Sequence, residues 1–470
     1  MRSLVLAVAL AACAGACAHR PSPSVDPVAA PVAAPAAAPV AAPAAAPAEL
    51  LAMVAAFDRM TAHPLWPGFE PARIPLAIFD GRDTFLVRHP SPPRGARRVS
   101  ESPPIDRLPG RDPAITANSS AVIGGVPNAT LLLAAGQERS ADQNGAVLVH
   151  EAFHVFQAAR HPTWNGNEAE LFTYPVDDPV VLRERDLEER ALVRALAAGE
   201  PGTSCWASVA LEARGRRFAR LGEGAIGYER GTELKEGLAR YLQNRAAGEK
   251  ASIVPLAPEQ IRDRAYATGA ALAELLDRAA PGWRETLEAG RAASLDQLLA
   301  ARLAARTGPA AAAPPCGWSP AETAAADRRA RAAAAGVGRG RADARRAFDA
   351  APGWRLVVTA GREPLWPQGF DPLNVRRVGA GALLHTRFLK LGNQSGTVEV
   401  LGHTSLSEAA GAHPLFKGVR RLVIGGLDRE PSARDQAGAL TIDADGIALV
   451  LRGARLERDP ERKELRVRVE

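Results

Sequence analysis

The chain has 470 residues, a formal net charge of +6 and a hydrophobic fraction of 47%. Its basic balance invites a nucleic-acid interpretation, but the Arg residues are interspersed with Asp and Glu along the whole chain, and no Arg cluster alternates with aromatic residues. We therefore expect no nucleic-acid partner. The hydrophobic fraction is ample for buried cores, and the length suffices for two or three domains behind the N-terminal segment.

Residues 1–17 predict an export signal. One cation, Arg2, precedes the apolar stretch Leu4–Ala12, which is too short for a membrane span and is typical of a secretory signal peptide. No later apolar stretch of the sequence has the length of a membrane span. We therefore expect an exported protein.

Cys13 ends this apolar stretch and predicts a lipid anchor. The run from Leu10 to Cys13 resembles the lipobox of bacterial lipoproteins, in which the Cys becomes lipidated and N-terminal. The resemblance implies that Cys13, with Cys17 as a second choice, makes the only attachment to a membrane. Ala14 behind it points to the outer membrane, with the protein facing the periplasm. Cleavage at an Ala-x-Ala-like site followed by plain secretion is the alternative.

Residues 18–48 predict an extended tether. From Pro21 to about Pro47 the chain is almost entirely Pro, Ala and Val, without a polar pattern or a helical period. This composition favours a semi-rigid chain of polyproline character. Behind a lipidated Cys, such a tether would hold a folded domain clear of the membrane.

Two short β elements are predicted next. The apolar runs Ile74–Phe79 and Thr84–Val87 flank Asp80-Gly81, which is typical of a β-hairpin. A further short strand is predicted over Thr130–Ala134.

The pattern His-Glu-Ala-Phe-His at residues 150–154 lies inside the apolar run Val147–Phe156 and predicts a buried helix. Residues four apart share one helix face, so His150 and His154 can bind the same metal ion. Glu151 can hydrogen-bond a metal-bound water and accept its proton as general base. This HExxH pattern predicts a zinc hydrolase with Zn²⁺ as cofactor. The alternative is a core helix whose histidines are satisfied by hydrogen bonds alone.

From Asp186 to about Leu303 the pattern is helical, with breaks at Pro201-Gly202 and Pro281-Gly282. Residues 306–352 form an Ala- and Arg-rich connector, in which Ser319–Ala350 predicts one or two solvated helices.

Residues 353–470 predict a small β-rich domain with Gly, Asn and Asp turns. Its clearest strands are Val398–Val400, Arg421–Gly426, Ile447–Leu451 and Leu465–Val469. The last of these alternates strictly, as an edge or half-exposed strand does. Pro64–Pro71 recurs as Pro364–Pro372, which either opens two similar β-rich units or repeats a Trp-anchored turn.

Two cysteines, Cys205 and Cys316, lie beyond the signal region and can pair in an oxidising compartment; the sequence leaves this pairing open. Five scattered histidines are predicted to be superficial: His63, His89, His385, His403 and His413.

A catalytic zinc needs a third protein ligand and an open position for water. The metzincin spacing is absent, because Gln157 and Arg160 occupy the positions of its Gly and His. Glutamates of two segments compete for the third position: Glu168 and Glu170, close behind the helix, and Glu236 further along.

The segment Glu236–Tyr241 resembles the Asn-Glu-Gly-Phe-Ala-x-Tyr helix of gluzincin metallopeptidases of the aminopeptidase-N-like group. The resemblance implies that Glu236 is the third zinc ligand, although many more residues separate it from His154 than in the family. Ala265–Ala270 is similar to the Tyr-x-Lys-Gly segment of that group, which implies that Tyr266 stabilises the oxyanion.

In zincins a strand in the position of Thr130–Ala134 runs along the cleft and can pair with an extended substrate. The family's Gly-x-Met-Glu-Asn segment, whose Glu holds a free amine, has Gly124–Asn128 as its nearest match. Pro127 stands in place of the Glu, which does not favour aminopeptidase specificity.

Together these features predict an α+β fold with five parts. They are a signal peptide (1–17), a tether (18–48), a zincin-like catalytic domain (49–305) that is mainly helical after the HExxH helix, a connector (306–352) and a β-rich domain (353–470).

The predicted function is an exported zinc metallopeptidase that hydrolyses peptide bonds of a peptide or protein substrate by a zinc-activated water. The alternative is a non-catalytic cell-envelope lipoprotein that uses a protease-like scaffold for binding. An enzyme acting on peptidoglycan cross-links differs only in its substrate.

Overall fold

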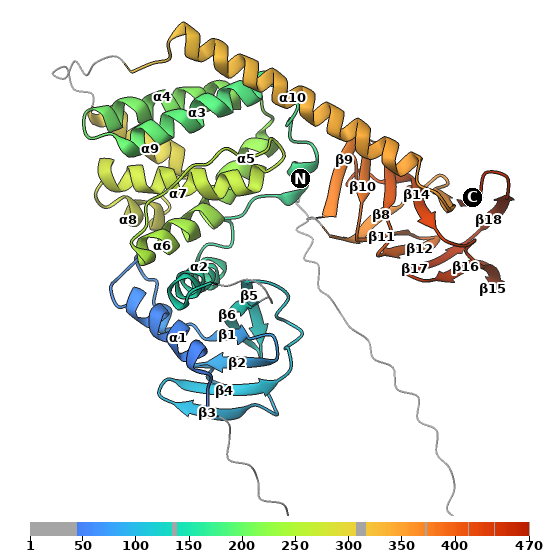
Figure 1. The fold of residues 1–470 in the computed structure, drawn as a ribbon, viewed down its shortest axis with the longest axis horizontal. Coiled ribbons are helices and arrows are strands. Elements are labelled where there is room, and N and C mark those ends of the chain that lie inside the picture. Colours follow the sequence, from blue (N-terminus) through green and yellow to red (C-terminus); the bar gives the residue numbers. More distant parts are fainter. Residues whose placement is uncertain are drawn as a thin grey trace, which may run out of the picture. The chain divides into compact units, whose positions relative to one another are not determined.

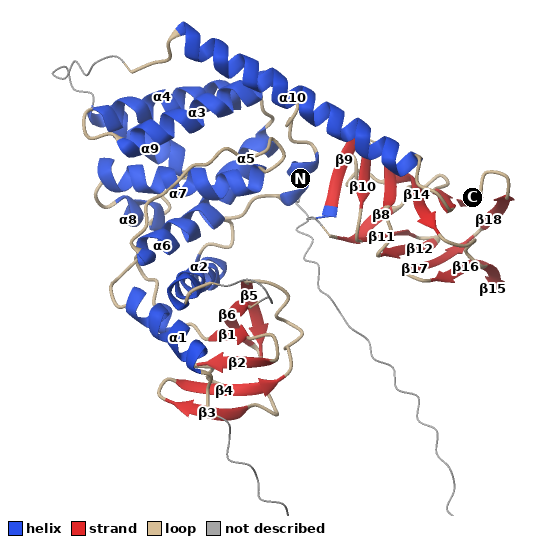
Figure 2. Cartoon of the chain, viewed as in Figure 1, coloured by secondary structure: helices blue, strands red, loops and turns tan. Residues whose placement is uncertain are grey.

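The computed structural model describes residues 45–133, 139–306, 316–371, 374–411, 413–436 and 438–469. The predicted signal peptide, Cys13 and nearly all of the tether lie outside these residues and stay predictions. The part from Ala45 onward forms one compact unit of mixed helices and strands, which is the α+β class expected from the sequence (Figures 1 and 2). Among the described helices, none combines the length and apolarity that a membrane span requires.

The unit begins with a helix and a six-stranded sheet. The elements are α1 (Ala48–Met60), β1 (Leu76–Phe79), β2 (Asp83–Val87), β3 (Arg97–Glu101), β4 (Pro104–Pro109), β5 (Ser119–Ile123) and β6 (Val126–Leu132). The strand order is β3-β4-β2-β1-β6-β5, and β1 and β6 pair in parallel.

The predicted hairpin is confirmed, because β1 and β2 pair antiparallel around the predicted turn. Asp80 Oδ1 accepts hydrogen bonds from the backbone N–H groups of Arg82 (2.8 Å) and Asp83 (2.7 Å). Gly81 adopts a φ of 98°, which a side chain would strain. The short polar loop therefore fixes the register of the two buried strands.

The strand predicted over Thr130–Ala134 begins earlier, at Val126, and ends at Leu132; Ala134 lies outside the described residues. It is bonded to β1 on one side and to β5 on the other. The expectation that this strand pairs with a substrate is therefore wrong, because both its edges are occupied. The two edge strands of the sheet are β3 and β5, and β5 is the one that packs against α2.

The middle of the chain is helical, as predicted. Its elements are α2 (Ala141–Arg160), η2 (Glu168–Phe172), α3 (Pro179–Ala197), α4 (Gly202–Phe218), α5 (Glu223–Thr232), η3 (Glu233–Gly237), α6 (Leu238–Ala247), α7 (Ile261–Ala279), α8 (Trp283–Glu288) and α9 (Leu295–Arg306). The predicted breaks fall between α3 and α4 and between α7 and α8. Helix α2 starts at a capping box, in which Ser140 and Gln143 satisfy each other's backbone N–H groups.

One hydrophobic core joins the sheet, α1, α2 and the later helices. Trp66 lies in it, with its ring edge-on to Phe153 (centroids 5.5 Å apart) and Trp283 (5.4 Å). In the repeated segment, Trp366 is instead an exposed residue of strand β8 (Trp366–Phe370). The two similar segments therefore open neither two similar units nor the same turn, since the first buries its Trp in a loop and the second forms a strand.

A buried network of ion pairs connects the helices. Its charged members, almost inaccessible to solvent, are Glu188, Arg214, Arg217, Glu229, Glu233 and Arg264. Arg214 donates from Nε to Glu188 (2.9 Å) and from both Nη atoms to Glu233 (2.8 and 2.5 Å). Arg264 donates to Glu229 (3.2 Å). Since these residues come from α3, α4, α5, η3 and α7, the network fixes how those elements pack.

Residues 320–349 form the single helix α10 (Pro320–Asp349), which starts at a capping box of Ser319 and Glu322. The helix packs against α3 and against strand β9 (Val375–Gly379). Its buried residues are Ala326, Ala330, Val337 and Phe348. The prediction of one or two solvated helices is therefore corrected to one helix with a buried face.

The C-terminal part is β-rich, as predicted. Besides β8 and β9, its strands are β7 (Trp354–Thr359), β10 (Ala382–His385), β11 (Phe388–Asn393), β12 (Gly396–Leu401), β13 (Ser405–Ala409), β14 (Val419–Leu427), β15 (Ala433–Gln436), β16 (Ala439–Ala444), β17 (Ile447–Arg452), β18 (Ala454–Asp459) and β19 (Glu464–Val469). They form sheets of order β18-β19-β7-β14-β13-β10-β9 and β15-β16-β17-β12-β11-β8.

Strand β19 is half-exposed, as its alternation predicted: one face is buried, and the strand lies between β18 and β7 and not at an edge. The prediction that His385 is superficial is wrong. His385 is buried and bonds Ser407 through Nε2 (2.9 Å). In the N-terminal sheet region His89 is likewise buried, with Nε2 at 3.0 Å from the carbonyl of Ile123.

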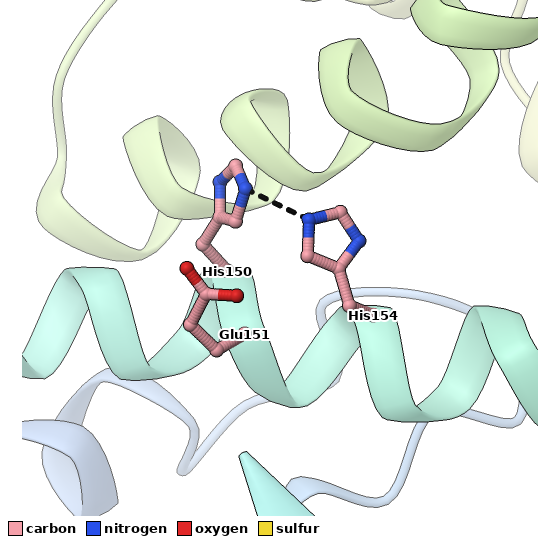
Figure 3. A group of neighbouring side chains, drawn as sticks. All are labelled: His150, Glu151 and His154. Atoms are coloured by element: carbon pink, nitrogen blue, oxygen red, sulfur yellow. Dashed lines mark hydrogen bonds between the residues drawn. The ribbon is translucent and has the colours of Figure 1, made fainter. Parts of the chain in front are cut away.

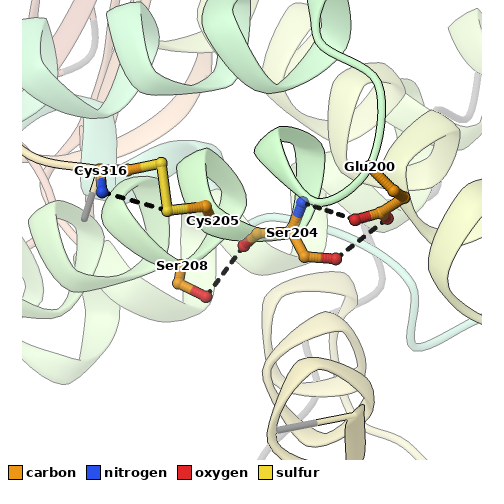
Figure 4. The surroundings of a disulfide bond; sticks show 5 residues. All are labelled: Glu200, Ser204, Cys205, Ser208 and Cys316. Atoms are coloured by element: carbon orange, nitrogen blue, oxygen red, sulfur yellow. Dashed lines mark hydrogen bonds between the residues drawn. A yellow bond between two sulfur atoms is a disulfide. The ribbon is translucent and has the colours of Figure 1, made fainter. Parts of the chain in front are cut away.

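Cys205 and Cys316 form a disulfide, which ties α4 to the segment before α10 (Figure 4). Next to it, the guanidinium of Arg194 lies over the rings of Trp206 (4.4 Å) and Trp318 (4.5 Å). The bond closes a sequence separation of 111 residues.

Candidate metal centre

The two histidines of the HExxH pattern meet on one face of α2 (Figure 3). His150 Nε2 and His154 Nε2 lie 3.0 Å apart, and both side chains are buried. One donor atom from each of His150, Glu151 and His154 lies within 4.8 Å of the others. The apolar flanks place this polar group inside the protein, where α2 packs on β5 and β6.

Glu236, on η3, completes this group of donors. Its Oε2 lies 3.0 Å from His154 Nε2 and 3.6 Å from His150 Nε2. The competing glutamates lie elsewhere: Glu168 pairs with Arg262, and Glu170 lies against Gly224. Of the three candidates for a third ligand, the structure therefore brings Glu236 to the histidines.

The spacing of the three donor atoms suits a tetrahedral metal. Bonds of about 2.1 Å to imidazole nitrogen and carboxylate oxygen place the ligand atoms of a tetrahedron about 3.4 Å apart. The observed separations are 3.0, 3.0 and 3.6 Å. Glu236 Oε2 is also a buried oxygen without a hydrogen-bond partner among the described residues. The residues present therefore fit Zn²⁺, whose usual ligands they are.

Glu236 stands on a short π-helical turn between α5 and α6. Such a turn inserts an extra residue into a helix and is common at functional sites. Gly237 lets this turn approach α7, because a Cβ at Gly237 would lie 2.6 Å from the Cα of Gly269. The same approach brings Tyr266, one turn earlier on α7, to the histidines.

Gln157 orients His154. The Oε1 of Gln157 lies 2.9 Å from His154 Nδ1, and its amide Nε2 donates to the carbonyls of Leu234 (2.9 Å) and Lys235 (3.0 Å). With both carbonyls accepting, Oε1 is left to accept from a protonated Nδ1, and Nε2 of His154 is free to bind a metal. The sequence indicates this contact only through spacing, because Gln157 follows His154 by three residues and so lies beside it on the helix.

Arg262 is a further residue of the site that the sequence analysis missed. It donates to Glu236 Oε1 (3.0 Å) and to Glu168 Oε1 (3.1 Å). This bond engages one oxygen of Glu236 and leaves Oε2 for a metal. Arg262 lies four residues before Tyr266 on α7, so helical spacing could have indicated it.

Tyr266 lies over His150, with ring centroids 5.9 Å apart and planes inclined by 10°. Burial and the charge of Glu236 raise the pKa of Tyr266 above its usual value. The phenol therefore stays protonated at neutral pH and can donate a hydrogen bond. The structure thus brings this predicted residue to the site.

Burial also sets the protonation of the other members. It lowers the pKa of His150 to about 4, which leaves the imidazole neutral and able to bind a metal. It raises the pKa of Glu151 to about 7. Burial opposes the charge of Glu236, but the two histidines beside it outweigh burial and hold the pKa of that carboxyl below its usual range.

A cavity of about 480 Å³ opens onto the donors and is lined by Ser119 and Ser120 at the start of β5. On another wall the rings of His161 and Trp164 are stacked, with centroids 3.8 Å apart. Glu288 holds this pair, because its Oε1 lies 2.7 Å from His161 Nε2.

Comparison of the chain with protein-family models, with curated proteins and with solved structures finds no match. The chemistry of the site is therefore inferred from its own residues.

Proposed function

We propose that the chain is a zinc-dependent peptidase with a zincin-like domain, in which His150, His154 and Glu236 hold Zn²⁺. The observation that carries this proposal is the buried triangle of their donor atoms, with sides of 3.0, 3.0 and 3.6 Å. Glu151 lies beside the triangle, as a general base for water requires.

Bound Zn²⁺ would supply Lewis-acid activation of water and of the scissile carbonyl. Glu151 accepts the proton of the attacking water and returns it to the leaving amine. Tyr266 donates a hydrogen bond to the oxygen on which negative charge develops. Gln157 and Arg262 hold the metal ligands in orientation.

The free edge of β5 supports an extended peptide as substrate. The hairpin loop Gly124-Gly125 makes Ile123 and Val126 a hydrogen-bonded pair, so alternation turns the backbone groups of Ser120 toward the open edge. Ser120 also lines the cavity at the donors. A peptide added along this edge would bind through main-chain hydrogen bonds with little sequence preference.

Export and lipid anchoring at Cys13 remain part of the proposal. The proposed location is the outer membrane, with the protein facing the periplasm. The disulfide between Cys205 and Cys316 supports an oxidising compartment, because such bonds are rare in the cytosol.

Elemental analysis tests the metal site. We expect about one zinc per chain in the wild type and in Glu170→Ala, and loss of zinc in Glu236→Ala, since a structural or catalytic zinc keeps at least three protein ligands. Glu170→Ala is the matched control, because Glu170 lies near the centre in sequence but not in space. Absence of zinc from the wild type would favour the non-catalytic scaffold.

Turnover tests the chemistry separately. Glu151→Gln should keep its zinc and lose about 10²–10⁴-fold in kcat on a mixed peptide library, the usual contribution of a general base. Unchanged turnover in this variant would refute the assigned role.

A further inference from the structure

His150 and Glu151 lie between two cavities. Besides the cavity of about 480 Å³ described above, a second of about 490 Å³ reaches the site. Both are lined by Asn118, His150, Glu151 and Tyr266. The wall that the two cavities share thus carries His150, Glu151 and Tyr266, whereas His154 and Glu236 line only the first cavity.

The cavities follow α2 in opposite directions. One includes residues of the first turns of the helix, among them Asp142 and Gln143, and the other continues to His161 just after its end. Nineteen residue steps of about 1.5 Å separate Asp142 from His161, which makes about 28 Å. At about 3.3 Å per residue, an extended chain of about eight residues spans this length.

Two of the charged residues that line these cavities, Asp142 and Arg262, are engaged in ion pairs and are therefore poorly suited to hold a chain end. An enzyme that removes terminal residues needs a carboxylate to bind the substrate's N-terminal ammonium group, or a cation to bind its C-terminal carboxylate. Asp142 pairs with Arg59 (2.6 Å), and Arg262 is shared between Glu168 and Glu236.

A carboxypeptidase interpretation would depend on Arg139 and Arg240, which line the second cavity, or on Lys235. Lys235 lines the first cavity next to Glu236, and its Nζ lies 3.4 Å from Asn165 Oδ1. The experiment below therefore includes Lys235 and Arg240.

We propose that the protein is an endopeptidase, which binds an extended segment of about eight residues along α2 and cleaves it internally. This inference rests on the proposed peptidase function. In the reaction, water adds to the internal carbonyl, the C–N bond breaks, and Glu151 carries the proton of the water to the new amine. The products are two shorter peptides, one with a new carboxylate and one with a new amino group.

Ten-residue peptides with an acetylated N-terminus and an amidated C-terminus test the inference against the same peptides with free ends. The full-length zinc-loaded protein is used, with Glu151→Gln as the inactive control, and products are identified by mass spectrometry. Blocked peptides should be cut at internal bonds, with kcat/KM within about tenfold of the free peptides, because a substrate that extends into both cavities presents no terminus to the reacting groups. Lys235→Ala in the first cavity, and Arg240→Ala and Glu249→Ala in the second, should each preserve this ratio.

Release of single residues from free peptides only, with blocked peptides slower by about 10⁴-fold, would overturn the inference and leave the peptidase function standing. Zinc binding without cleavage of either pool would overturn both.

A pair of variants tests the two-sided groove. Trp164 lines the first cavity and Gln243 the second. Trp164→Ala and Gln243→Ala should each raise KM for an eight-residue blocked peptide by about 3–10-fold, the effect of losing one substrate contact. If only one of the two variants raised KM, the substrate would occupy only one cavity, which would contradict the inference.

Discussion

At the scale of single residues, the site depends on partners of the donors as much as on the donors themselves. Gln157 connects α2 to η3, because its amide joins His154 to the carbonyls of Leu234 and Lys235. It thereby sets both the tautomer of one histidine and the distance to the segment that carries Glu236.

Gln157→Leu should therefore weaken zinc binding by about 10–100-fold, the usual effect of losing a partner of a metal ligand. The dissociation constant is measured by competition with a chelator. Gln157→Glu keeps the acceptor for His154 but cannot donate to the two carbonyls, so it should lie between the wild type and Gln157→Leu. Equal affinity in all three proteins would show that the amide does not orient the ligand.

How far the sequence predicts the site also differs from residue to residue. His150, Glu151 and His154 follow from helical spacing alone, because four residues make about one turn. Glu236 came from a family resemblance, since no local pattern distinguishes it from Glu168. The bonds of Gln157 could not be predicted, because its acceptors lie 77 and 78 residues away in the chain.

At the scale of elements, two helices carry the third donor and the phenol into place. The π-turn η3 and helix α7 touch at Gly237 and Gly269, where neither side has room for a methyl group. Each Cβ would lie 2.6–2.7 Å from the opposite Cα. This contact fixes the separation of Glu236 and Tyr266 from α2.

Gly269→Ala should push α7 away from η3 and destabilise the fold by about 1–3 kcal/mol, the usual cost of overpacking. Zinc affinity should fall with it, because Glu236 moves. Gly215→Ala is the control: its Cβ would meet no atom within 4 Å, so the fold should be unchanged or stabilised by about 0.5–1 kcal/mol. Urea unfolding compares the two variants, and a neutral Gly269→Ala would rule out the tight contact.

Elements were predicted better than their arrangement. The hairpin at Asp80-Gly81 follows from local turn chemistry, and so do the helix breaks at the Pro-Gly pairs. Local sequence does not predict that β5 forms a sheet edge. That position results from the parallel pairing of β1 with β6, whose paired residues are over 50 positions apart in the chain. The burial of His89 and His385 likewise had no periodic signal.

At the scale of the whole molecule, buried charges make stability depend on pH. Burial tends to raise the pKa of Glu188 and Glu229, but the guanidinium groups of Arg214, Arg217 and Arg264 outweigh it and lower both pKa values in the folded state. The folded pKa values therefore lie below the unfolded value of 4.5. The associated stability is complete above pH 4.5 and is lost as the pH falls further.

Urea unfolding between pH 7 and pH 3 should show this loss below pH 4.5. Arg217→Met leaves buried carboxylates without a partner and should cost about 3–5 kcal/mol at pH 7. The pH dependence of its free energy of unfolding should also be flatter, because the carboxyl pKa values rise toward that of the unfolded chain. A variant with the pH profile of the wild type would exclude the network as its origin.

The disulfide acts at the same scale. Because it closes a separation of 111 residues, Cys205→Ser with Cys316→Ser should lower the free energy of unfolding by about 2–4 kcal/mol. Thermal unfolding of the double variant, beside the wild type with and without reductant, measures this. Reductant should change the wild type and leave the double variant unaffected.

The position of Glu236 has a consequence for synthesis. Two donors of the triangle lie on α2 and the third on η3, 82 residues later in the chain than His154. A nascent chain, or a chain threaded unfolded through a translocation channel, holds only the two histidines and Glu151 together. The proposed hydrolytic site is thus assembled only when η3 and α6 have packed beside α2. If the chain is the exported peptidase proposed above, the producing cell is in this way protected from its activity until the protein has folded.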